Sequence, residues 1–111
     1  MRAKEIAVKI LRQLGGNKFI VMTGAKKIGY HHYETKGIVE LSFKIGKNST
    51  CVNTVRIHYV ESKDLYNMYF NYEGITKDFS PFKKEMASYE DIYCDQMQDL
   101  FTSTTGLYTR I

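Results

Sequence analysis

The chain has 111 residues, of which 43% are hydrophobic and 25% charged, and this composition is typical of a globular domain rather than of a disordered chain. Its length predicts a single domain over residues 1–111. No apolar run approaches the roughly 20 residues that span a bilayer. The N-terminal segment has the pattern of an amphipathic stretch rather than of a signal peptide. We therefore expect a cytoplasmic protein that has no contact with a membrane.

The two halves of the chain carry opposite net charge. Residues 1–60 contain eleven lysines and arginines against three acidic residues, whereas residues 61–111 contain five against nine. Such a separation bears on the charge of a partner rather than on the fold. The basic first half could attract phosphate groups; alternatively, both halves simply present solvated surfaces.

The first segment predicts a helix, because apolar residues between Ala3 and Leu14 recur at intervals of three and four and form one stripe. Gly15-Gly16 ends it, since glycine adopts the left-handed conformation of a helix C-cap without strain. Residues 19–23 then predict a short apolar strand closed by Gly24. Residues 28–33 predict a second strand, weakened by a glycine, or an ordered loop.

Strict alternation of apolar and polar residues marks the middle of the chain and predicts strands with one dry and one wet face. The strands expected there are residues 39–45, 54–59 and 66–72, with turns at 46–49 and 62–64. Consecutive strands joined by tight turns indicate an antiparallel meander. Residues 74–87 are expected to form an irregular loop around Pro81, held on the core by Phe79 and Phe82.

A second helix is expected from Ser88, a natural N-cap that Asp91 completes as a capping signal, to the threonines and glycine at 102–106. One face of this helix would be apolar and the opposite one acidic. Together the elements predict an α+β fold: an antiparallel sheet of four to five strands, with an N-terminal and a C-terminal helix covering one face.

The sequence contains no complete catalytic or phosphate-binding motif. Gly24 and Gly29 have the spacing of a phosphate-binding loop, but Tyr30 stands where that loop requires lysine. The segment is then an ordinary turn, or a basic loop in which Lys26 and Lys27 contact phosphates.

The histidines and cysteines lack the spacing of a metal site. His31 and His32 would point to opposite faces of a strand. Cys51 and Cys94 are expected to be reduced thiols, one of them a core residue. Acidic neighbours on the predicted helix would raise the pKa of the Cys94 thiol and make it a poor nucleophile. We expect no enzymatic activity, no metal and no other cofactor.

The outward face of the predicted sheet is the strongest candidate site. Alternation places cations beside an aromatic side chain and amides there, which is what a platform for single-stranded nucleic acid needs. An exposed antiparallel sheet is also ordinarily polar and slightly basic, so the same pattern has a purely structural explanation. The expected nucleic-acid contacts are Lys18, Lys26, Lys27, Lys44, Lys47, Arg56 and Tyr69.

Both ends of the chain resemble one family. The segments that carry the resemblance are LRQLGGNKF (11–19), MTGAK (22–26), YCDQMQDLF (93–101) and TGLYT (105–109). They resemble a family of small bacteriophage and mobile-element proteins for which no activity is established. The resemblance implies expression inside an infected or element-bearing bacterium, hence the host cytoplasm, and assigns no residue roles.

Two functions are compatible with these observations. The first is a non-enzymatic accessory protein of a phage or mobile element that binds DNA or RNA through its basic first half. The alternative is a protein-binding module, either a homodimer or an inhibitor of a host protein. The aromatic residues around Pro81 and the apolar tail at 107–111 favour the alternative.

Overall fold

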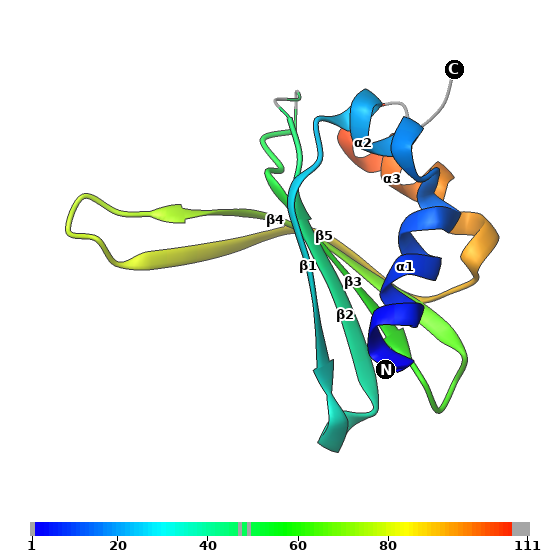
Figure 1. Ribbon diagram of the computed structural model, residues 1–111. Coiled ribbons are helices and arrows are strands. Elements are labelled where there is room, and N and C mark those ends of the chain that lie inside the picture. The colour runs from blue at the N-terminus through cyan, green and yellow to red at the C-terminus, as the bar shows by residue number, and fades with distance from the viewer. Residues whose placement is uncertain (1, 47, 49, 108–111) are drawn as a thin grey trace.

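In the computed structural model, which describes residues 2–46, 48 and 50–107, three α-helices pack on one face of a five-stranded antiparallel sheet (Figure 1). The strands follow one another across the sheet in chain order, as a meander. This arrangement confirms the predicted α+β fold with a helix at each end of the chain. The elements are α1 (Arg2–Leu14), α2 (Asn17–Thr23), β1 (Lys26–Tyr33), η1 (Glu34–Lys36, a 3₁₀ turn), β2 (Ile38–Lys44), β3 (Thr54–Val60), β4 (Leu65–Ile75), β5 (Pro81–Ile92), η2 (Cys94–Gln96, a 3₁₀ turn) and α3 (Met97–Thr105).

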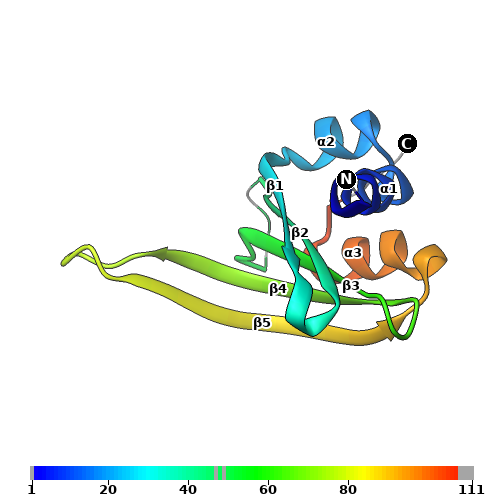
Figure 2. The same cartoon turned by 60° about the horizontal axis from the view of Figure 1, so that its bottom comes forward.

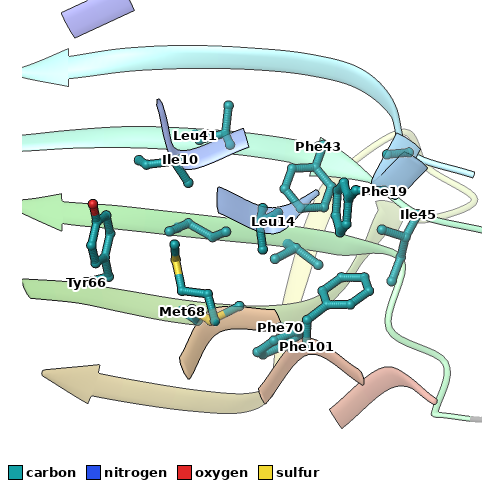
Figure 3. Close-up of a cluster of buried hydrophobic side chains, with 14 of the residues drawn as sticks. Ile10, Leu14, Phe19, Leu41, Phe43, Ile45, Tyr66, Met68, Phe70 and Phe101 are labelled. Carbon is teal, nitrogen blue, oxygen red and sulfur yellow. The ribbon is translucent and has the colours of Figure 1, made fainter. Parts of the chain in front are cut away.

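The core lies between the helices and the inner face of the sheet (Figure 3). The predicted apolar stripe of α1 is buried there through Ile10 and Leu14. Three aromatic rings meet at its centre: the Phe19 centroid lies 5.3 Å from that of Phe43 and 5.1 Å from that of Phe101. Burial of these large side chains supplies most of the free energy that holds the helices on the sheet.

The strand predicted at residues 19–23 was wrong, because these residues form α2. Phe19 and Thr23, four residues apart, are the two that α2 buries, and the Thr23 hydroxyl donates a hydrogen bond to the Phe19 carbonyl at 2.7 Å. Val21, by contrast, is 80% exposed. The β-branched and aromatic residues favour a strand locally, but the burial of one helical face against the sheet outweighs that preference. Gly24, at φ 68°, caps the helix.

The C-terminal helix was predicted to begin at Ser88, which was wrong because α3 begins only at Met97, and the loop predicted at 74–87 was also wrong. Both segments belong largely to the β4–β5 hairpin: Ser88 pairs with Tyr69, and the chain becomes helical only after Tyr93. The register shifts twice along β5, between the partners of Tyr66 and Met68 and between those of Phe70 and Asn71. Each bulge inserts a residue and interrupts the alternation. The apolar residues of β5 are therefore spaced irregularly and mimic a helical pattern.

The far end of the β4–β5 hairpin projects beyond the rest of the sheet (Figures 1 and 2). We call residues 72–84 the arm, since β3 begins opposite Asn71 and does not reach past it. The Phe82 ring lies over Gly74, where an added Cβ would approach it to 2.9 Å, and contacts the Tyr72 ring at 5.5 Å. Phe79 was expected to hold this segment on the core, but its side chain is 86% exposed at the tip.

Both cysteines are free thiols on the surface, so the expectation that one of them belongs to the core was wrong. Cys51 lies in the connection before β3, and Cys94 begins the 3₁₀ turn that follows β5. Among the described residues, no helix combines the length and the apolar character that a membrane span requires.

Candidate nucleic-acid interface

The face of the sheet that points away from the three helices has no helix packed on it in the described part of the chain (Figure 2). We call it the open face. Alternation predicted which residues of β2, β3 and β4 point there, and the burial of Leu41, Phe43 and Ile57 on the helix side confirms the assignment. The polar and aromatic residues of β1 to β4 on the open face are His31, Tyr33, Glu40, Ser42, Lys44, Thr54, Arg56, His58, Asn67, Tyr69, Asn71 and Glu73. The same face carries Gly29 of β1 and, at one end, the apolar residues Ile38, Val60 and Leu65.

Four rings form a continuous diagonal row across the open face, which we call the ring row. The centroids of His31 and Tyr33 are 4.3 Å apart, those of Tyr33 and His58 are 6.3 Å apart, and those of His58 and Tyr69 are 4.9 Å apart. At the β1 end, Lys36 Nζ lies 5.7 Å from the centre of the Tyr33 ring. The ring row therefore contains rings from three strands, and a lysine side chain lies next to its β1 end.

Of these rings, only Tyr69 was predicted as a contact residue. His31 and Tyr33 were missed because Gly29 made the strand at 28–33 uncertain. The signal was present nevertheless: in a strand, His31 and Tyr33 must face opposite to Tyr30. In the structure Tyr30 pairs with Leu41 and lies on the helix side.

Arg56 occupies the centre of the open face and is held by two carboxylates. Its Nε lies 3.1 Å from Glu73 Oε2, its Nη2 lies 3.0 Å from Glu73 Oε1, and its Nη1 lies 3.2 Å from Glu40 Oε1. The other Glu40 oxygen accepts a hydrogen bond from His58 Nε2 at 2.7 Å. Asn71 donates to Glu73 at 2.9 Å. The positive charge of Arg56 is thus already balanced within the protein.

These contacts lower the pKa of both carboxyl groups. For Glu40 the hydrogen bond from His58 is the main cause of the lowered pKa, opposed by burial and reinforced by the charge of Arg56. For Glu73 burial by itself would raise the pKa, but the hydrogen bonds from Arg56 and Asn71 and the charge of Arg56 together lower it. Both groups therefore stay ionised near neutral pH.

The chemistry of this cluster is that of a fixed ionic network. A general acid or base works best when its pKa lies near the working pH, and both carboxyl pKa values here move away from neutrality. A buried ionic cluster also stabilises a fold no more than well-packed apolar side chains of similar size would. Glu40, 7% exposed, and Asn71, 2% exposed, are nevertheless buried on this face. Stability alone does not explain such a polar cluster.

The structure divides the predicted basic contacts among separate places. Lys26 and Lys44 are direct partners across β1 and β2, and Lys44 Nζ donates to the Thr54 hydroxyl at 2.9 Å. Lys27 is exposed at the bulge that follows Lys26, with φ 54°. Lys18 belongs to α2, in the helical layer. Lys47 lies outside the described residues.

The basic first half therefore does not form one continuous surface. Lys4, Lys9 and Arg12 are exposed on α1, whose other side is buried against the sheet. Lys44 shares the open face with Ser42 and Glu40, on the opposite side of the sheet from the helices, and Lys26 is its direct partner on β1. The segment from Gly24 to Gly29 is a helix cap followed by the start of β1, not a phosphate-binding loop.

A shallow hollow of about 200 Å³ lies on the open face and is lined by residues of β2, β3, β4 and the edge strand β5. Two of its lining residues, Lys83 and Glu85, come from β5 and were assigned to a loop by the sequence. The pairing of Glu73 with Lys83 and of Asn71 with Glu85 brings β5 beside the ionic network. The other lining residues are Glu40, Arg56, His58, Tyr69 and Asn71.

The adjacent histidines separate as the alternation predicted. The His31 ring contacts Tyr33 on the open face, whereas His32 Nε2 lies 3.3 Å from Glu61 Oε1. Within the described ranges, no group of three or more histidine, cysteine, aspartate and glutamate side chains is placed to hold a metal ion.

Comparison of the chain with protein-family models, with curated proteins and with solved structures gives no significant match. The resemblance of its two ends to phage and mobile-element proteins therefore stays a prediction.

Proposed function

We propose that this protein is a non-enzymatic accessory protein that binds single-stranded nucleic acid on its open face. The ring row is the observation that carries the proposal. Unpaired bases stack on aromatic side chains whatever their sequence, and each stacked base contributes about 1–3 kcal/mol. The phage or mobile-element setting is part of the proposal and rests on the resemblance of the chain ends.

The distribution of charge supports contact with phosphates at one end of the open face. Lys26, Lys27 and Lys44 gather where β1 and β2 meet, while Arg56 is already paired. Small residues, Gly29 and Ser42, lie between these lysines and the rings and leave room for a backbone to approach. Three phosphate contacts on a single strand correspond to a slope of log affinity against log salt of about −2.

The test is fluorescence anisotropy with labelled single-stranded DNA and RNA oligonucleotides. Tyr69→Ala removes one ring of the row, and we expect it to weaken binding by about 1–3 kcal/mol. Tyr30→Ala is the matched control, because Tyr30 is 44% exposed but faces the helix side. Circular dichroism of both variants checks that the fold is intact.

The two variants separate the proposal from a structural role of the rings. Equal affinity of Tyr69→Ala and the original chain for both oligonucleotides contradicts the proposal. The double change Lys26→Glu with Lys27→Glu is expected to reduce binding further and to flatten the salt dependence. A flat dependence in the original chain would show that phosphates are not being neutralised.

A protein-binding module is the second candidate, favoured by an apolar patch on α2. Val21 is 80% exposed and, with Asn17, Lys18 and Met22, lines a groove of about 250 Å³. Sedimentation of the original chain and of Val21→Glu tests it. A monomer in both cases, with no partner recovered from a host lysate, contradicts this role. The change at Lys26 and Lys27 should leave it intact.

A further inference from the structure

The arm is the largest feature that the open-face site leaves unexplained. Beyond Asn71 it consists of two strands only, and an isolated hairpin is marginally stable in water. It nevertheless exposes large apolar side chains: Phe79 is 86% exposed and Ile75 is 68% exposed. Exposure of this kind on a projecting element marks a contact surface.

The charge of the arm favours a phosphate-bearing partner. The arm contains Lys77, Lys83 and Lys84 against two acidic residues, Glu73 and Asp78, and Glu73 is already paired with Arg56. That aspartate accepts a hydrogen bond from the Thr76 hydroxyl within the tip. The C-terminal half of the chain is acidic overall, so a basic arm is a local departure from the charge around it.

The arm is continuous with the open face. Glu73 and Lys83 are direct partners, and Lys83 lines the same hollow as Tyr69 and Arg56. On that side of the ribbon, Ile75 and Pro81 follow as the next pair. A strand that crosses the ring row and leaves it at Tyr69 would therefore meet Lys83 and then the apolar end of the arm.

We propose that the arm is a second part of the same nucleic-acid site, in which Lys83 binds a phosphate and Phe79 stacks on an unpaired base. The inference rests on the proposed function of the open face. From Asn71 to Ile75 the ribbon extends about 13 Å at 3.3 Å per residue. A stacked strand rises about 3.4 Å per nucleotide, so the arm lengthens the site by about four nucleotides.

The experiment is a length series of fluorescein-labelled oligodeoxythymidylates of four, eight and twelve nucleotides. Phe79→Asn removes the ring and suits the backbone, because asparagine tolerates the left-handed φ of 65° at this position. Val21→Asn, on the exposed side of α2, is the matched control. Lys83→Glu tests the phosphate contact, and Lys84→Glu is its matched control, because Lys84 pairs with Tyr72 and points to the opposite side of the ribbon.

Phe79→Asn should weaken binding of the twelve-mer at least about fivefold and leave binding of the four-mer unchanged. Lys83→Glu should reduce the salt slope for the twelve-mer by about 0.7, which corresponds to one lost contact, whereas Lys84→Glu should leave the slope unchanged. If the original chain binds the four-mer and gains nothing with length, or if the arm variants affect both lengths alike, the arm inference fails while the open-face proposal stands. Absence of binding at every length removes both.

Two other partners are distinguished by the same variants. If Phe79→Asn converts a dimer into a monomer in sedimentation and leaves the length series unchanged, the tip contacts a second copy of the chain and the inference is overturned. Binding to anionic phosphatidylserine vesicles that depends on Phe79, with an unchanged length series, overturns it in favour of a lipid surface.

Discussion

Neutralising Glu73 should release Arg56 for contact with phosphate. In Glu73→Gln the side chain keeps its shape but loses its charge and one of the two oxygens that accept from Arg56, at 3.1 and 3.0 Å. Arg56 then retains one ionic partner, Glu40, at 3.2 Å. We therefore expect the variant to bind single-stranded nucleic acid more tightly than the original chain.

The expected magnitude follows from the geometry. One additional phosphate contact steepens the salt slope by about 0.7. A hydrogen bond to a charged group contributes about 1.5–3 kcal/mol when buried, but the Arg56 side chain is 31% exposed and solvent screens the pair. The loss in free energy of unfolding should therefore be close to about 1 kcal/mol.

The assay is anisotropy with a labelled oligonucleotide over a range of salt concentrations, paired with urea unfolding. Glu85→Gln is the matched control. Glu85 lines the same hollow, and its substitution removes the same charge without breaking any of the contacts to Arg56 described above. The reasoning is refuted if Glu73→Gln has the same slope as Glu85→Gln, or if it binds more weakly than the original chain.

Three further predictions concern the fold. Phe101→Ala, at a fully buried ring, should lower the free energy of unfolding by about 3–5 kcal/mol in urea titration, whereas Val21→Ala should change it little. Gly24→Ala places a Cβ 3.4 Å from backbone at φ 68° and should destabilise by about 1–2 kcal/mol, whereas Gly29→Ala, with open space around it, should be near neutral in the same assay. Folding lowers the pKa of Glu40. The ionised Glu40 therefore contributes its full stabilisation of the fold above the ordinary glutamate pKa of about 4.3. This stabilisation is lost as the pH falls through the lower pKa that Glu40 has in the folded protein. Unfolding measured against pH should thus show a shallower acid loss in Glu40→Gln.

Local patterns were sufficient for the parts of the fold that rest on regular periodicity. The stripe of α1 and the alternation of β2, β3 and β4 predicted which apolar side chains form the core. Alternation did not predict that Glu40, Thr54 and Asn71 on the opposite face are buried as well. They also placed Arg56 and Tyr69 on the open face. These elements each bury one face, so the period of the apolar residues reports the structure directly.

The failures arose where tertiary contacts or bulges decide the structure. Phe19 forms part of α2 because it fits between Phe43 and Phe101, contacts that are distant in the chain. The two bulges of β5 interrupt its alternation of apolar and polar residues, so the sequence pattern of this strand predicted a loop followed by a helix. The pairing of Arg56 with Glu73 joins residues of neighbouring strands, and only the sheet register reveals that this cation is already balanced.

The most direct measurement of the central claim is a map of backbone amide chemical shifts during titration with a short single-stranded oligonucleotide. The account predicts that the largest shifts fall on β1, β3 and β4 around Tyr33, His58 and Tyr69, while exposed residues of α1 remain unchanged. Shifts confined to the helical layer, or none at saturating oligonucleotide, would contradict it.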